Sequence, residues 1–322
     1  MRVGFLNNQI DNRGTGNALF DYAYYNQTLL NNESVIFTFT QGSSDSLMEK
    51  RLTDTFGGVH NIQDAFGEDG YQAFRLDVLY HIKYGNDSIN SISLPNCRYV
   101  VHAVFDVSNP HGDRFAAVSP WLASQAKKKI PYVPHIVNGR HNELTGFTSL
   151  RERLGIPPDA TVFGRHGGPD TFDIPWVWDA ITDAINYDPN LYFIFLGTNV
   201  PKNLTDFYTG RIISLPVTSV YQDIFDFVHS CDAMLHARSR GETFGLACSE
   251  FDTKPILTYG LSPERAHFDL IRKPVLYFSQ EGLTDILLNF PIIRDVQPRR
   301  EHGYEQFTPE ATMKVFDEVF LK

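Results

Sequence analysis

Short apolar runs alternate with longer amphipathic stretches along the first half of the chain. Four runs have the length and apolar character of buried strands: RVGFLNN at 2–8, SVIFTF at 34–39, LDVLYHI at 76–82 and RYVVHAVF at 98–105. Helical stretches separate some of them, such as NALFDYAYYNQTLL at 17–30. This alternation is typical of a parallel sheet that is covered by helices.

The second half of the chain repeats the alternation more clearly. Strands are predicted at 161–168, 191–199, 211–217, 233–239 and 255–260. Helices are predicted between them, at 174–185, 220–231 and 244–251. The tail TPEATMKVFDEVFLK opens with a threonine cap and a proline, which predicts a terminal helix. The pattern therefore predicts a second parallel sheet and an α/β fold of two doubly wound domains.

A segment without clear periodicity separates the two halves. Residues 131–148 mix proline, glycine, asparagine and histidine, and this composition predicts a linker. We expect an N-terminal domain over residues 1–148, a C-terminal domain over 149–305 and a C-terminal helix over 306–322. Packing of that helix on the N-terminal domain is one possible arrangement. Two such domains would leave a cleft between the carboxyl ends of their sheets, where α/β proteins bind ligands.

Composition narrows the classes of partner. The chain has 322 residues and a formal net charge of −10, which opposes binding to nucleic acid because such binding depends on basic surface. No run of about 18 apolar residues is present to span a bilayer. The segment SPWLASQAKKKIP ends in three lysines, so any membrane contact would be at most peripheral.

The amino terminus and the cysteines bear on the cellular compartment. The first residues enter a strand directly, without the apolar stretch and cleavage site of a signal peptide. The three cysteines have no paired spacing and are typical of reduced thiols. Both features predict a cytoplasmic protein, and the cysteine spacing predicts no zinc site.

The segment HARSRGETFGLACSEF at 236–251 carries the strongest chemical signal. Glu242 and Glu250 flank a Phe-Gly-Leu turn that is predicted to open a helix. The first N–H groups of a helix have no intrahelical partner and can bind a phosphate or a diphosphate. Carboxylates are good acceptors for hydroxyl groups. A sugar nucleotide has that layout, since hydroxyls lie on both sides of its two phosphates.

The spacing of the two glutamates resembles the E-x7-E signature of retaining glycosyltransferases with the GT-B fold, especially family 4. Other segments are similar to that family and occur in the right order: YVVHAVF, AAVSPWL, YVPHIVNG and SLRERLGIPPDATVFGR. Together these resemblances extend over about residues 1 to 260. The resemblance implies two Rossmann-like domains, with the donor bound by the second and the acceptor by the first.

The resemblance also implies roles for the residues of the turn. Glu250 would hold the ribose hydroxyls of the donor, and Glu242 would contact the donor sugar. The backbone of Phe244, Gly245 and Leu246 would cap the diphosphate and the sugar.

Four further residues match positions of the family. Arg165 matches an arginine that neutralises the diphosphate, and His102 matches a histidine near the donor sugar. Gly14 and Gly16 match a glycine loop that opens the first helix and faces the phosphates. Ordinary alternatives remain open: an ion pair between domains for Arg165, a hydrogen-bonded core position for His102 and a plain helix-opening turn for the glycines.

The sequence departs from the family at one position. Family members usually carry a lysine about six residues after the arginine that Arg165 matches, and here position 171 is threonine. Stabilisation of the leaving group needs positive charge where negative charge develops. We expect Arg240 or Arg238 to supply it.

The sequence therefore predicts a retaining, hexosyltransferase-type enzyme that uses a nucleotide-sugar donor and an acceptor of unknown class, such as a glycan or a lipid. In the reaction that the resemblance implies, the leaving diphosphate helps to remove the acceptor's proton, so neither a metal nor another cofactor is needed. The alternatives are a sugar-nucleotide binding protein without turnover, and a GT-B epimerase or phosphorylase.

Overall fold

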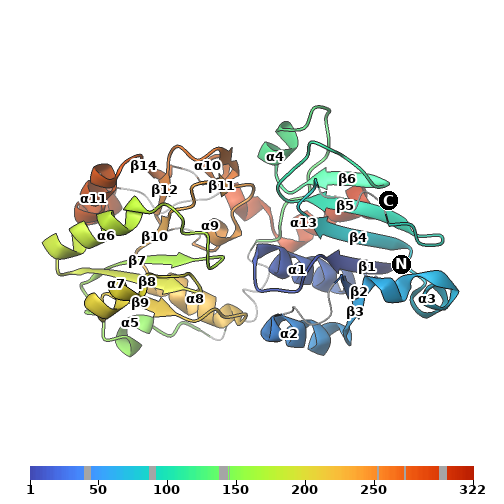
Figure 1. The fold of residues 1–322 in the computed structure, drawn as a ribbon, viewed down its shortest axis with the longest axis horizontal. Coiled ribbons are helices and arrows are strands. Elements are labelled where there is room, and N and C mark those ends of the chain that lie inside the picture. Colours follow the sequence, from blue (N-terminus) through green and yellow to red (C-terminus); the bar gives the residue numbers. More distant parts are fainter. Residues whose placement is uncertain are drawn as a thin grey trace. The chain divides into compact units, whose positions relative to one another are not determined.

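The computed structural model describes residues 1–39, 45–86, 92–137, 144, 146–251, 254–271, 273–296 and 303–322. The chain divides into two compact units. The first unit comprises Met1–Gly139 and Gln306–Lys322, and the second comprises Arg140–Glu305. The red C-terminal helix α13 lies among the blue to cyan elements of the first unit (Figure 1). The sequence-based boundary at 148/149 lies nine residues after the division at 139/140, and the predicted linker falls partly outside the described residues.

The first unit contains a six-stranded sheet in which all neighbouring strands are parallel. Its spatial order is β3-β2-β1-β4-β5-β6. The strands are β1 (Arg2–Asn7), β2 (Glu33–Thr38), β3 (Val59–Asn61), β4 (Val78–Lys83), β5 (Arg98–Ala103) and β6 (Arg114–Ala117). The four predicted strands are confirmed. The edge strands β3 and β6 were not predicted, because runs of three and four residues are too short to show periodicity.

The described helices of the first unit are α1 (Gly14–Thr28), α2 (Ser46–Phe56), α3 (Gly67–Phe74), α4 (Pro120–Ser124) and α13 (Pro309–Phe316), with short helical turns η1 (Ile62–Ala65) and η4 (Asp317–Leu321). Side-chain caps open three of these five α-helices, namely α2, α4 and α13. Thr308 accepts a hydrogen bond from the Ala311 N–H, and Pro309 occupies the first turn, as predicted for the terminal helix.

Aromatic contacts join α13 to the core of the first unit. The Phe316 ring lies 6.2 Å from the Phe5 ring, 5.3 Å from Tyr22 and 5.1 Å from Tyr80, measured between centroids. These four residues are all fully buried and come from α13, β1, α1 and β4. The C-terminal helix α13 therefore packs into the same hydrophobic core as β1 and α1 at the start of the chain.

The second unit repeats the architecture. Its six-stranded sheet has the order β14-β12-β10-β7-β8-β9, again with parallel neighbours. The strands are β7 (Thr161–His166), β8 (Leu191–Leu196), β9 (Ile212–Leu215), β10 (Ala233–His236), β12 (Ile256–Tyr259) and β14 (Val275–Tyr277). A separate two-stranded sheet pairs β11 (Gly241–Glu242) with β13 (Glu264–Arg265). The five predicted strands of this half are confirmed, and β14, β11 and β13 were not predicted.

Nine helical segments of the second half complete the described elements. They are α5 (Leu150–Arg153), α6 (Trp176–Tyr187), α7 (Lys202–Phe207), α8 (Tyr221–Ser230), α9 (Leu246–Glu250), α10 (Ala266–Leu270), α11 (Gln280–Leu288), α12 (Phe290–Val296) and the short turn η3 (Gly303–Gln306). The core of this unit contains Phe163, whose ring stacks on Phe193 and contacts Phe290 edge-on. Within the described residues, no helix is both long and apolar enough to cross a bilayer.

The strand orders place one switch point in each sheet. The order reverses between β1 and β4 in the first unit and between β7 and β10 in the second. Ligands of open α/β sheets bind beyond the carboxyl ends of the strands at such points. In the second unit these ends carry Arg165, His166 and His236. The candidate site is therefore expected at this edge of the second sheet.

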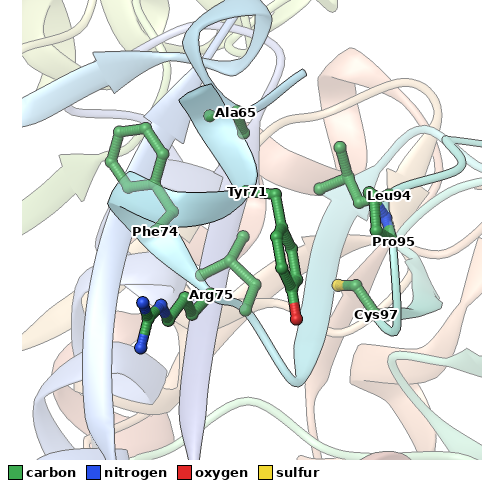
Figure 2. A pocket seen from close by; sticks show the side chains of 9 residues that line it. Ala65, Tyr71, Phe74, Arg75, Leu94, Pro95 and Cys97 are labelled. Carbon is green, nitrogen blue, oxygen red and sulfur yellow. The ribbon is translucent and has the colours of Figure 1, made fainter. Parts of the chain in front are cut away.

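The first unit has a small hollow at the opposite end of its sheet. It is lined by side chains that include Tyr71, Phe74, Leu94 and Cys97 (Figure 2). Cys97 directly precedes β5, and Phe74 ends α3 before β4 begins, so the hollow lies near the amino ends of these strands. It is remote from the edge of the sheet where ligands of this fold class bind.

Candidate functional site

A glycine turn opens helix α9. Gly245 precedes the helix and has φ = +94°, a left-handed conformation that disfavours any residue with a Cβ atom. A Cβ atom there would lie 2.8 Å from the Tyr304 hydroxyl oxygen and 3.3 Å from the His267 Cβ. The Tyr304 hydroxyl also donates a hydrogen bond of 2.6 Å to the Phe244 carbonyl. The turn is therefore fixed by packing and accepts only glycine.

The helix is shorter than the sequence predicts. It begins at Leu246 and ends at Glu250, whereas 244–251 was expected, so Phe244 and Gly245 precede it. Phe244 is buried, and its ring contacts the Tyr304 ring edge-on. The physical reason is the left-handed φ of Gly245, which interrupts helical geometry.

Glu242 lies in β11 and is held by two side chains. Its Oε1 lies 3.1 Å from His236 Nε2, and its Oε2 lies 2.7 Å from Arg238 Nη1. Burial alone would raise the pKa of Glu242, but Arg238 and the hydrogen bond from His236 outweigh it and lower the pKa to about 2. Glu242 is therefore an ionised acceptor with unused lone pairs, since a carboxylate offers about four acceptor positions.

Glu250 has a similar arrangement at the end of α9. Its Oε2 lies 2.7 Å from Nε2 of His166, the last residue of β7. This is a close contact between the two side chains without the alignment of a hydrogen bond. The His166 ring also stacks on Phe251. Each glutamate is thus held by a histidine at the carboxyl end of a strand, and the two strands, β7 and β10, are neighbours in the sheet.

Sequence reasoning missed both of these histidines. The signal that could have found them is their position, since each ends an apolar strand that runs into the predicted site. The position at a strand end led to the prediction of Arg165, but it did not show that the next residue, His166, also belongs to the site.

Arg165 is buried under the loop that follows β7. Its guanidinium donates to the His166 carbonyl, and its Nη2 donates to Thr171 Oγ1 at 2.8 Å. A Cβ atom on Gly167, whose φ is +145°, would lie 2.8 Å from this guanidinium. Burial lowers the pKa of Arg165, although the nearby Glu242 carboxylate acts in the opposite direction. The guanidinium nevertheless stays charged, because arginine is not deprotonated in proteins.

Thr171 occupies the position where the family has a lysine. Its hydroxyl accepts from Arg165 and donates 2.7 Å to the Gly168 carbonyl. Thr171 therefore orients Arg165 and supplies no charge of its own.

The two arginines that were expected to replace the lysine are both paired with carboxylates. Arg238 contacts Glu242, and Arg240 Nε lies 2.6 Å from Glu264 Oε1 in β13. Ser239 between them donates from its backbone N–H and its hydroxyl to Asp173, at 2.6 and 2.9 Å. Arg238 is therefore directed towards Glu242, and Arg240 away from that carboxylate towards β13.

In the first unit, His102 is a core residue of β5. It is fully buried, with Nδ1 2.7 Å from the Tyr80 hydroxyl and Nε2 2.9 Å from the Val133 carbonyl. Burial lowers its pKa to about 3. These contacts agree with the core position that the sequence left open, and the predicted contact with a donor sugar finds no support in them.

Gly14 and Gly16 lie in the first turn of α1. A Cβ atom on Gly16 would lie 1.9 Å from the Asp11 carbonyl oxygen, so the loop after β1 packs directly on the helix there. This close approach accounts for Gly16 by packing. A role of either glycine towards phosphates stays a prediction.

Comparison with known proteins gives a result at the level of the fold. No protein-family model and no curated protein matches the sequence. Solved structures do match over almost the whole chain. The two units and their parallel sheets are those of the GT-B glycosyltransferases. The chain has the GT-B fold.

Three of the similar structures are representative. HepE of Anabaena, solved in complex with UDP and glucose, has a TM-score of 0.66 and 16% identity, with 99% of this chain and 95% of that chain covered. WaaG, a glycosyltransferase involved in lipopolysaccharide biosynthesis, has a TM-score of 0.61 and 12% identity, with 99% of each chain covered. A sucrose-phosphate synthase of Thermosynechococcus elongatus has a TM-score of 0.63 and 9% identity, covering 99% of this chain and 95% of that chain. The predicted fold class is confirmed.

Proposed function

We propose that the chain is a retaining, hexosyltransferase-type glycosyltransferase, similar to family 4, that transfers a sugar from a nucleotide-diphosphate donor to an acceptor such as a glycan or a lipid. The observation that carries the proposal is the arrangement around Gly245. Two carboxylates, Glu242 and Glu250, lie before and after one tight turn of backbone, and a histidine holds each of them. Such an arrangement suits a ligand with hydroxyl groups on both sides of an anion.

The donor would bind along this turn. The diphosphate would accept hydrogen bonds from the backbone N–H groups of Gly245 and Leu246 at the start of α9. Glu242 would accept hydroxyls of the donor sugar through the lone pairs that His236 and Arg238 leave unused. Glu250 would accept the ribose hydroxyls. Arg165 and Arg238 would supply positive charge near the phosphates.

In the proposed reaction the bond between the sugar's anomeric carbon and the phosphate oxygen breaks, and a bond from the acceptor oxygen forms on the same face of the sugar. The departing phosphate oxygen takes the acceptor's proton, so no side-chain base is required. The negative charge that develops on the leaving diphosphate is stabilised by the guanidinium groups and the N–H groups of the turn. No step of this scheme uses a metal ion, another cofactor or a covalent enzyme intermediate.

Similar proteins support the choice of donor. HepE of Anabaena has been solved in complex with UDP-glucose as well as with UDP.

One observation favours a second candidate, a sugar-nucleotide binding protein without turnover. Thr171 replaces the family's lysine, and both arginines that could compensate already contact carboxylates.

A nucleotide panel followed by a turnover assay tests the proposal. We expect one of UDP, GDP, ADP and CMP to raise the melting temperature, since a ligand at a hundredfold excess over its Kd adds about 2.7 kcal/mol to stability. The matching nucleotide sugar should then be hydrolysed slowly with retained anomeric configuration, as read by NMR, and Glu242→Gln should abolish that hydrolysis.

The matched control is Glu281→Gln, which removes an exposed carboxylate in the first turn of α11 and should leave hydrolysis unchanged. Binding of a nucleotide without hydrolysis of its sugar donors would favour the second candidate. No response to any of the four nucleotides would contradict both.

A further inference from the structure

A chain of four side chains runs from the candidate site into the core of the second unit. Glu242 Oε1 lies 3.1 Å from His236 Nε2, and His236 Nδ1 lies 2.9 Å from Thr258 Oγ1. Thr258 Oγ1 lies 3.2 Å from Nε2 of His267. The three residues behind Glu242 are fully buried and come from β10, β12 and α10. The register of the sheet brings them together, because His236 is paired with Thr258 across β10 and β12.

The proton positions along this chain follow from its acidic end. Glu242 is ionised and can only accept, so His236 Nε2 must carry the proton that it donates. Burial lowers the pKa of His236, so its ring is neutral and its Nδ1 is a bare acceptor. The Thr258 hydroxyl must then donate to that Nδ1, which leaves its oxygen free to accept.

The same reasoning assigns the proton positions at the inner end of this hydrogen-bonded chain, at His267. Burial lowers the pKa of His267 to about 3, so this ring is also neutral. Its Nε2 carries the proton that it donates to Thr258. Its Nδ1 is then a bare acceptor, and within the described part of the chain this buried nitrogen has no hydrogen-bond partner. All three donated hydrogen bonds therefore run in one direction, towards Glu242.

We propose that Thr258 and His267 are positioning residues that act through His236, holding its Nε2–H tautomer so that the Glu242 carboxylate keeps its free lone pairs towards hydroxyls of the donor sugar. The opposite tautomer of His236 would present a lone pair to an ionised carboxylate, and the two would repel each other. Without the Thr258 hydroxyl, only the repulsion from Glu242 opposes that tautomer, because His236 Nδ1 then loses its described hydrogen-bond partner. Only the part of the inference that concerns the sugar hydroxyl rests on the proposed function. The tautomer of His236 can be measured without any substrate.

The test compares Thr258→Val with Thr258→Ser in the full chain. The valine keeps the shape and removes the hydroxyl, whereas the serine keeps the hydroxyl. Long-range proton–nitrogen NMR of histidine-labelled protein should show His236 as the Nε2–H tautomer in the native protein and in Thr258→Ser, and as a mixture of tautomers in Thr258→Val. The loss of one hydrogen bond that supports a charged group should lower the rate of donor hydrolysis roughly ten- to a hundredfold in Thr258→Val, with the Kd for the free nucleotide unchanged.

Two further variants keep the test decisive. Thr312→Val removes another fully buried hydroxyl, in α13 of the first unit, and should change neither the tautomer nor the rate. His267→Phe removes the N–H donor to Thr258 and should also give a mixture of His236 tautomers, so it replaces Thr258→Val if that variant does not fold. A His236 ring that stays fully Nε2–H in His267→Phe would then count against the inference. A His236 ring that stays fully Nε2–H in Thr258→Val, with hydrolysis within twofold of native, would overturn the inference. If the native protein hydrolyses no donor, the proposed function fails, and the tautomer result alone then decides whether the chain of hydrogen bonds holds His236.

Discussion

Buried histidines contact different kinds of partner in the two units. His166 and His236 lie at strand ends and contact the carboxylates of the candidate site. His102 lies one residue before the end of β5, and both of its ring nitrogens are used by Tyr80 and Val133 within the core. The difference depends on the partners that packing supplies, because all three histidines lie in the last two residues of an apolar strand.

His102 should make the protein sensitive to acid. Its pKa of about 3 lies below its usual value of 6.5, so the unfolded chain takes up a proton between these pH values and the folded protein does not. The contribution of His102 to the free energy of unfolding is therefore fully present at pH 7 and decreases as the pH drops below 6.5. At pH 5 the free energy of unfolding is lower by about 2 kcal/mol because of this residue. We expect His102→Gln to be less stable than native at pH 7 and to lose less stability between pH 7 and pH 5, as measured by urea unfolding.

The same variant separates the two interpretations of His102. A core role predicts that donor hydrolysis at pH 7 survives in the folded variant. A contact with the donor sugar predicts that hydrolysis is lost. An equal drop in stability from pH 7 to pH 5 in both proteins would contradict the assignment of the acid sensitivity to this residue.

The elements of the site are short where the chemistry is concentrated. Helix α9 has five residues and β11 has two, so neither is stable by itself. Tertiary contacts fix them instead. Tyr304 binds the Phe244 carbonyl, and β13 pairs with β11. The candidate site is therefore a set of short segments held by the larger sheet beside them.

Gly245→Ala tests whether this turn depends on its backbone conformation. A Cβ atom would be placed at φ = +94° and within 2.8 Å of the Tyr304 hydroxyl oxygen. We expect the free energy of unfolding to fall by at least about 1 kcal/mol, the usual cost of a left-handed non-glycine residue, and nucleotide binding to weaken, as measured by urea unfolding and by calorimetry.

The matched control is Gly282→Ala in α11. There the added methyl group would find its nearest neighbour, Ser279 Oγ, at 3.5 Å, and the backbone conformation is an ordinary one. Alanine should stabilise this helix by up to about 1 kcal/mol. Similar losses of stability in both variants would show that the Gly245 turn has no special backbone requirement.

At the scale of the whole molecule, the chain leaves its first unit near Gly139 and returns to it at Gln306. The first unit thus depends on residues at both ends of the sequence. The C-terminal segment is not an appendage, since Phe316 and Phe320 are fully buried in that unit and contact Tyr80. Removal of this segment would open the core between α1 and the central strands.

Phe316→Ala should therefore destabilise the first unit selectively. Truncation of a buried phenylalanine costs about 3–5 kcal/mol. We expect faster amide hydrogen exchange in β1 and β4 and no comparable change in β7 and β8, as measured by mass spectrometry. Phe207→Ala, at a position that is 78% exposed in the second unit, is the control and should change neither region. Equal acceleration in both sheets would contradict the assignment of α13 to the first unit.

The sequence by itself determined the alternation of the longer strands with helices, the resemblance to the GT-B fold class and the two glutamates around a glycine turn, because hydrophobic periodicity and short motifs are local properties of the chain. Tertiary structure alone decided the partners. Thr258 lies 22 residues after His236 and nine before His267, and only the register of β10 and β12 makes them neighbours. The same holds for Thr171 beside Arg165 and for α13 in the first core, since a hydrogen bond or a buried contact depends on distances that no local pattern contains.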